Sequence, residues 1–197
     1  MKNKFELLAP AGDLEKLKIA VLYGADAVFV GSKEFSLRSR ASNFTVNDLK
    51  EGAKFCHEHN AKLYVTTNIV PHNQDLIGLI DYLEDLEEAG VDAIICSSYA
   101  VMCIAKRYTN LEIHVSTQQS LTNSLGVKFY EDFGATRVVL AREMSIEQIK
   151  NIERQSDKKI SEWQSNIALL TINVHINYLK SKFKRNKKAT LYQRSCL

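Results

Sequence analysis

The stretch Tyr23-Gly24-Ala25-Asp26-Ala27-Val28 decides the fold, because an amphipathic segment ends at its glycine and a short apolar run begins after it. Glycine and asparagine tolerate the left-handed backbone conformation that ends a helix, so this junction predicts a helix followed by a strand. Similar junctions recur at residues 59–64, 89–94, 109–113 and 133–138. Together they predict a chain of alternating strands and helices.

Six short and mostly apolar runs are the predicted strands. Such runs are typical of parallel strands that are buried on both faces. Between them, Asp13 predicts a helix start, and Thr45 with Asp48 resembles a capping box. Residues 75–89 carry apolar side chains at helical spacing and predict one helix. The predicted strands are residues 5–9, 27–30, 62–67, 93–96, 112–116 and 137–140.

Six successive strand–helix units are compatible with a (β/α)₈ barrel or with a doubly wound sheet. The sheet receives no support, because no Gly-x-Gly-x-x-Gly motif follows a predicted strand. A barrel typically needs about 250 residues, and this chain has 197. We therefore predict an α/β fold of the TIM type, an incomplete (β/α) barrel of six units over residues 1–159. An atypical basic tail, residues 160–197, follows it.

Composition excludes several classes of protein. The chain is 45% hydrophobic and 25% charged, which is ordinary for a globular protein. No apolar run approaches the roughly 18 residues that a membrane span needs, and the first residues do not resemble a signal peptide. The spacings of the four cysteines match neither a zinc nor an iron–sulfur site. We expect a cytoplasmic protein with reduced thiols and no membrane association; the cysteines are Cys56, Cys96, Cys103 and Cys196.

The charge changes sign near the end of the chain. Residues 1–150 carry a net charge of −4, whereas residues 151–197 carry +7. Residues 180–194 form a basic run in which Phe183 and Tyr192 are interleaved. Such a run is compatible with binding to nucleic acid; the alternative is solvated or disordered polypeptide.

Candidate binding residues follow the predicted strands, because barrel enzymes carry their chemistry at the carboxyl ends of the strands. We predict that Arg38, Asn68, Gln118 and Arg142 bind a small carboxylate or phosphate. Arginine and amide side chains donate the hydrogen bonds that such anions accept. Arg40 is a further candidate on the loop of Arg38.

Two residues of the same loops are the candidate acid–base groups, Glu143 and His72. The alternative for Arg142 and Glu143 is a structural ion pair across the barrel mouth. His114 lies inside a predicted strand, where a histidine of the core or lumen is expected more often than a ligand. Cys96 ends a strand, where it is either a small buried residue or a nucleophile.

Five motifs, in the same order, resemble the collagenase-like peptidase family, peptidase family U32, over residues 4–155. They are ELLAPAG at residues 6–12, YGADAV at 23–28, NIVPHN at 68–73, VSTQQ at 115–119 and FGATRVVLARE at 133–143. The resemblance implies a barrel-type catalytic domain in a cytoplasmic bacterial protein. It implies three activities among family members, which are collagenase-like peptidase (hydrolase) activity, prephenate-dependent hydroxylation of tRNA or rRNA, and oxygen-independent hydroxylation of ubiquinone precursors.

The chain departs from this family after Lys159. Members continue with a seventh strand and a signature rich in Gly and Cys, whose cysteines hold an iron–sulfur cluster in the hydroxylating members. This chain has no cysteine between Cys103 and Cys196, so we expect it to bind no such cluster. Our hypothesis is that a frameshift or an early stop replaced the remainder and left a truncated barrel. Its open strand edges favour association or a complementing chain.

Three functions are open at this point. The first is an RNA-modifying enzyme derived from prephenate-dependent tRNA or rRNA hydroxylation, with RNA and a small carboxylate as partners. The second is a peptidase, which rests on the family name alone. The third is a non-catalytic fragment whose basic tail binds nucleic acid. Enzyme activity therefore follows from the resemblance, and the truncation predicts weak activity.

Overall fold

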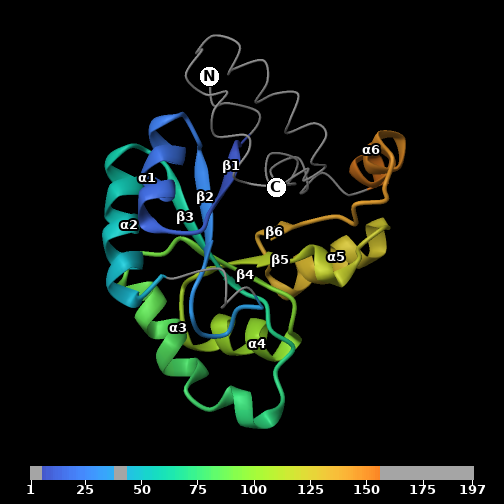
Figure 1. The fold of residues 1–197 in the computed structure, drawn as a ribbon. Coiled ribbons are helices and arrows are strands. Elements are labelled where there is room, and N and C mark those ends of the chain that lie inside the picture. The colour runs from blue at the N-terminus through green and yellow to red at the C-terminus, as the bar shows by residue number, and fades with distance from the viewer. Residues whose placement is uncertain (1–5, 38–43, 156–197) are drawn as a thin grey trace.

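A single curled sheet of parallel strands forms the centre of the molecule (Figure 1). The computed structural model of the chain describes residues 6–37 and 44–155. Within these residues, strands that are consecutive in sequence are neighbours in the sheet, in the order β1-β2-β3-β4-β5-β6. This order is the one that a (β/α) barrel requires. The strands are β1 (Leu8–Ala11), β2 (Ala27–Gly31), β3 (Lys62–Thr67), β4 (Ala93–Cys96), β5 (Glu112–Val115) and β6 (Arg137–Val138).

The helices lie along the outer face of the curled sheet, one after each strand (Figure 1). The prediction of an incomplete barrel of six strand–helix units is therefore confirmed. The helices are α1 (Leu14–Leu22), α2 (Val46–Glu58), α3 (Leu79–Glu88), α4 (Tyr99–Tyr108), α5 (Ser124–Phe133) and α6 (Ile146–Gln155), with two short 3₁₀ helices, η1 (Asn73–Leu76) and η2 (Thr117–Gln119). No helix of the described ranges is long and apolar enough to cross a membrane.

The helix starts follow the predicted caps. The Asp13 side chain accepts a hydrogen bond from Lys16 N at 2.8 Å, and Thr45 with Asp48 forms a complete capping box. The helix predicted over residues 75–89 is wrong in extent. Gly78 adopts a positive φ of 79° and separates η1 from α3, because glycine is the residue that takes this conformation without strain.

The junctions that decided the fold also tie neighbouring strands together. The Asp26 carboxylate accepts a hydrogen bond from Leu7 N at 2.6 Å, just before β1. The Asp92 carboxylate accepts one from Leu63 N at 2.8 Å in β3. In each case the backbone N–H of the aspartate also donates to the carbonyl of the same partner residue. The Gly-x-Asp sequence therefore ends a helix and joins the next strand to the previous one.

Side chains of each strand alternate between the two faces of the sheet. The outward face and the helices enclose the main hydrophobic core, which includes Leu17, Val28, Leu63, Leu83 and Ile94. The inward face carries a smaller apolar cluster of Leu8, Ala27, Tyr64 and Ala93. Because this face is the interior of the incomplete barrel, polar side chains on it lie in the lumen.

Several sequence-based predictions lie outside the described residues. These are the basic tail, residues 160–197, the boundary at residue 159, and both arginines of the loop after β2, Arg38 and Arg40.

Candidate ligand site at the carboxyl ends of the strands

Two predicted binding residues meet at the carboxyl ends of β3 and β5. The Asn68 Nδ2–H group donates to Gln118 Oε1 at 2.8 Å, although the two residues are 50 positions apart in sequence. Gln118 Nε2 in turn donates to the Asn68 carbonyl at 3.4 Å. Asn68 follows β3 directly, and Gln118 lies on η2, directly after β5. The parallel strands therefore bring the two amides to one place on the rim.

The hydrogen bonds of this pair fix which way the amides point. Asn68 Oδ1 accepts from Leu37 N at 3.3 Å, and Gln118 Oε1 also accepts from Ser116 Oγ at 3.3 Å. Both amide oxygens are thus engaged, and each –NH₂ group carries two N–H donors, of which one is used within the pair. A pair of this kind offers donors to a ligand, so it favours a ligand rich in acceptors, such as a carboxylate.

A second chain of polar contacts supports the pair from β4 and α5. Ser97 Oγ donates to the Asn68 carbonyl at 3.4 Å, and Gln119 Nε2 donates to the Ser97 carbonyl. Tyr130 OH donates to Gln119 Oε1 at 2.7 Å. The roles of Ser97, Gln119 and Tyr130 were not predicted from the sequence, although the first two follow predicted strands, where their position was a signal.

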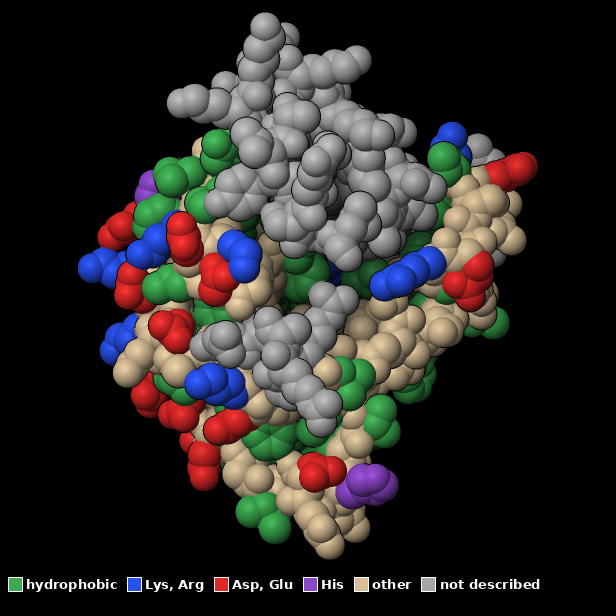
Figure 2. All heavy atoms as spheres, in the orientation of Figure 1, with side chains coloured by type: hydrophobic (Ala, Val, Ile, Leu, Met, Phe, Trp, Pro, Cys, Tyr) green, Lys and Arg blue, Asp and Glu red, His purple; other side chains and the backbone are tan. Residues whose placement is uncertain are grey.

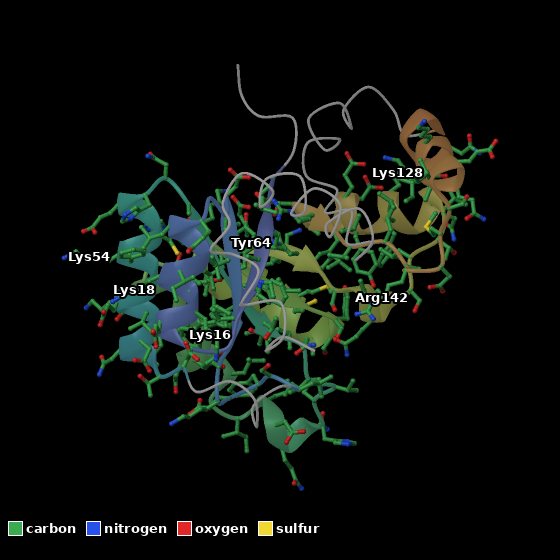
Figure 3. The ribbon with its side chains drawn as sticks, turned by 45° about the horizontal axis from the view of Figure 1, so that its top comes forward. Lys16, Lys18, Lys54, Tyr64, Lys128 and Arg142 are labelled. Atoms are coloured by element: carbon green, nitrogen blue, oxygen red, sulfur yellow. The ribbon has the colours of Figure 1, made fainter. Side chains whose placement is uncertain are left out.

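The other predicted site residues stand further out on their loops. Arg142 and Glu143 are exposed on the loop between β6 and α6, and Figure 3 shows Arg142 on this loop. His72 is exposed before η1, where its backbone N–H donates to Asp75 Oδ2 at 2.8 Å. No hydrogen bond among the described residues joins these three side chains to Asn68 or Gln118.

Neither Arg142 nor Glu143 forms an ion pair with a residue that the structure describes. The alternative interpretation of these two side chains as a structural ion pair is therefore not supported by their described surroundings. Their roles in ligand binding and acid–base chemistry stay predictions.

Two of the described cysteines, Cys56 and Cys96, are unsuited to nucleophilic chemistry. Cys56 and Cys96 are fully buried, and burial raises the pKa of each thiol to about 12. A thiol with such a pKa is inert at neutral pH. Cys103 is half-buried on α4. No group of three or more His, Cys, Asp or Glu residues that could hold a metal ion occurs in residues 6–37 and 44–155, so an iron–sulfur cluster does not fit these residues.

A charged cluster lies at the opposite, amino ends of the strands, inside the barrel. Arg137 donates to Glu6 through both terminal nitrogens, Nη1 to Oε1 at 2.5 Å and Nη2 to Oε2 at 2.9 Å. Tyr64 OH donates to Glu6 Oε2 at 3.0 Å. Arg137 and Tyr64 are buried. We name Glu6, Tyr64, His114 and Arg137 the interior cluster.

Sequence analysis predicted the location of only one member of this cluster. His114 was expected in the core or lumen, and it is 1% exposed. The available signal was the alternation of polar side chains along β3 and β5, where Lys62 and Tyr64, and Glu112 and His114, share the inward face.

The outer surface of α1 and α2 mixes charges of both signs. Figure 2 shows acidic and basic side chains interspersed on the left of the molecule, where Figure 1 places these helices. Figure 3 places Lys16, Lys18 and Lys54 there, and Lys18 Nζ donates to Glu51 Oε1 at 2.5 Å. RNA-binding faces carry an excess of positive charge, so this surface does not indicate one.

Comparison with known proteins supports one family. The model of peptidase family U32 matches residues 12–168. The chain is 50% identical over 159 residues to the tRNA hydroxylation protein P1 of Bacillus subtilis. The aligned region covers 80% of this chain and 38% of the relative. It is 46% identical over 154 residues to an uncharacterized protease of Methanocaldococcus jannaschii, covering 78% of the chain and 37% of that relative.

A solved U32 peptidase has a similar fold. Its TM-score is 0.64 at 11% identity, over 82% of this chain and 74% of the solved chain. At this identity the likeness concerns the fold alone. The chain thus has the sequence and the fold of this group, and it spans less than two fifths of the length of the two curated relatives.

Proposed function

The chain belongs to peptidase family U32, and on this basis we propose that it is part of an enzyme that hydroxylates tRNA and uses a small carboxylate ligand. The observation that carries the proposal is the Asn68–Gln118 amide pair, in which both side-chain oxygens and one N–H of each amide are engaged, and the second N–H of each amide can bind an acceptor. The name of the Bacillus subtilis relative supports tRNA as the substrate.

Prephenate is the ligand that the family resemblance implies. It carries two carboxylates, and amide N–H groups bind carboxylates through hydrogen bonds that are stronger than those to neutral acceptors. We propose that Asn68 and Gln118 bind one carboxylate and that Arg142 supplies positive charge for the other. Arg38, which lies outside the described residues, is a second candidate for this role.

We propose His72 and Glu143 as the groups that exchange protons with the substrate. Both are exposed at the rim, on loops that follow β3 and β6. They would have to approach the ligand when RNA binds, because the described contacts do not join them to the amide pair.

Proteolysis is less well supported by the same residues. The thiols of Cys56 and Cys96 are buried with raised pKa values. The hydroxyls of Ser97 and Ser116 contact amide and carbonyl groups, Ser97 donating to the Asn68 carbonyl and Ser116 to Gln118. A serine nucleophile needs a general base within hydrogen-bond reach, and the contacts described for these serines are of another kind.

Two measurements test the proposal. The first is the titration of the complete 197-residue chain with prephenate by calorimetry. Asn68→Ala and Gln118→Ala should each weaken binding by about tenfold or more, since a hydrogen bond to a charged group is worth about 1.5–3 kcal/mol. Asn73→Ala is the matched control, because Asn73 is an exposed asparagine at the start of η1, beyond the loop of Asn68, and it should leave the affinity unchanged.

The second measurement is made in cells. The chain is expressed in Bacillus subtilis that lacks its own tRNA hydroxylation protein P1, and tRNA nucleosides are analysed by mass spectrometry for one added oxygen. Restored hydroxylation that Asn68→Ala abolishes supports the proposal. The proposal is contradicted if neither alanine substitution changes the prephenate affinity, or if tRNA hydroxylation is retained in both variants.

A further inference from the structure

Two buried polar atoms of the interior cluster have no hydrogen-bond partner among the described residues. They are His114 Nδ1 and Arg137 Nε. The two residues are 1% and 4% exposed. Leaving a buried donor or acceptor unsatisfied costs about 1–3 kcal/mol, so native proteins generally pair such atoms with protein groups, with water or with a ligand.

The two atoms belong to side chains that converge. His114 on β5 and Arg137 on β6 are direct partners in the register of the sheet, so they share its inward face. Both contact the ring of Tyr64. The His114 ring packs edge-on at a centroid distance of 4.6 Å, and the Arg137 guanidinium carbon lies 5.1 Å from the Tyr64 centroid. Figure 3 shows Tyr64 in the interior of the sheet.

The remaining hydrogen bonds define what each atom can do. Both terminal nitrogens of Arg137 donate to Glu6. The Nε–H group, which can only donate, is the nitrogen that has no described partner. His114 Nε2 faces Glu112 Oε2 at 3.4 Å. The hydrogen bond with His114, followed by the charge of Lys62, lowers the pKa of Glu112 to about 2. The carboxylate is therefore ionised at neutral pH and can only accept a hydrogen bond.

His114 Nε2 consequently carries the proton, and Nδ1 is left as an acceptor. Burial, and then the charge of Arg137, lower the pKa of His114, while Glu112 and Glu6 oppose this change. The ring is neutral near pH 7. A group that satisfies both atoms must accept from one and donate to the other.

Of the two strands that flank Tyr64, one presents a small side chain on the inward face and the other an aromatic ring. Ala93 on β4 is the register partner of Tyr64, whereas Phe29 is its register partner on β2. Ala93 therefore adds only a methyl group to the inward face beside Tyr64.

We propose that His114 and Arg137 form an interior binding site for a hydroxyl oxygen, which accepts from Arg137 Nε–H and donates its proton to His114 Nδ1. A water molecule and the hydroxyl group of a small organic ligand share this chemistry. The site lies at the amino ends of the strands and is independent of the proposed ligand site at the rim.

The test uses the complete chain with ¹⁵N-labelled histidine. The imidazole nitrogen signals of His114 should report a protonated Nε2 and an unprotonated Nδ1 that accepts a hydrogen bond. Water relaxation dispersion should report one long-lived internal water that is lost in His114→Phe. His57→Phe removes an exposed histidine and is the control that should keep that water.

Native mass spectrometry distinguishes the two sources of the oxygen. A bound mass that disappears in His114→Phe identifies an organic hydroxyl ligand, whereas no bound mass together with the long-lived water identifies water. A protonated His114 Nδ1, or a signal of an Nδ1 without a hydrogen bond, overturns the proposal. The histidine signals of the unmodified chain decide this outcome even if His114→Phe fails to fold.

Discussion

At the carboxyl ends of the strands, Asn68 and Gln118 are accessible to solvent and keep N–H donors for a ligand, whereas at the amino ends Arg137 and Glu6 satisfy each other in a buried, bidentate pair. Both regions are polar and both join strands that are distant in sequence. The difference is that the amide pair keeps hydrogen-bond donors for a ligand, whereas Arg137 and Glu6 are paired with each other inside the protein. We therefore expect ligand binding at the rim, and we expect the interior cluster to contribute chiefly to stability, as the amino-terminal face of a barrel does.

The largest effect on stability is expected when the positive charge of Arg137 is removed from the interior cluster. Arg137→Met leaves the Glu6 carboxylate without its cation beside buried Tyr64. We expect a decrease in the free energy of unfolding of about 3 kcal/mol or more, because an uncompensated charge remains in a poorly solvated place. Urea unfolding measures the decrease, and Lys18→Met, which breaks the exposed pair with Glu51, should cost only about 0–1 kcal/mol.

The double variant Glu6→Gln with Arg137→Met refines this test. It removes both charges, so it should recover part of the stability lost in Arg137→Met alone. If Arg137→Met unfolds at the same urea concentration as Lys18→Met, the interior cluster does not stabilise the fold and the comparison fails.

The contrast between the two regions also shows what sequence can predict. The rim pair followed from a general rule, because residues after parallel strands meet at one edge of the sheet, and Asn68 and Gln118 both follow strands. The Glu6–Arg137 pair joins residues 131 positions apart, and no local pattern connects them. Its formation depends on the curvature of the whole sheet, which spacing along the chain does not reveal.

Some features of the local backbone conformation could likewise be predicted from the sequence, and others could not. The Gly-x-Asp junctions were predictable because each combines a helix end with a strand start. The break at Gly78 was missed because the apolar periodicity of residues 75–89 continues across it. Periodicity reports which face is buried, whereas the backbone angle of one glycine decides whether the helix is continuous.

A smaller effect on stability is expected at residues 35–37, which follow β2 and contact Asn68. Phe35 has a positive φ of 53°, its carbonyl accepts from Ile69 N at 3.3 Å, and Leu37 N donates to Asn68 Oδ1. Its ring contacts Tyr82 at a centroid distance of 4.9 Å. The left-handed backbone of this residue therefore helps to orient the Asn68 amide.

Two substitutions separate the backbone from the ring. Phe35→Asn and Phe35→Val both lose the ring contact, but asparagine tolerates the left-handed conformation and valine does not. We expect Phe35→Val to be about 1 kcal/mol less stable than Phe35→Asn in thermal or urea unfolding. Equal stability of the two variants would mean that the backbone at this position is not strained and that only the ring matters.

The smallest expected effect is a dependence of stability on pH, which comes from a single group. Burial and Arg137 lower the pKa of His114 in the folded chain, whereas Glu112 and Glu6 oppose this change and Tyr64 contacts the ring. Below about pH 6.5, the ordinary histidine value, the unfolded chain binds more protons than the folded chain. The free energy of unfolding should therefore fall as the pH decreases from about 6.5 towards the lowered pKa.

Urea unfolding at pH values on either side of about 6.5 measures this contribution. His114→Gln should flatten the dependence, whereas His59→Gln, at an exposed position, should leave it unchanged. The stabilisation by Glu112, whose pKa is lowered to about 2, is lost only below about pH 4.5 and does not overlap this window. A dependence that is the same in His114→Gln as in the unmodified chain would show that His114 binds protons equally in the folded and the unfolded chain, so that its surroundings do not lower its pKa.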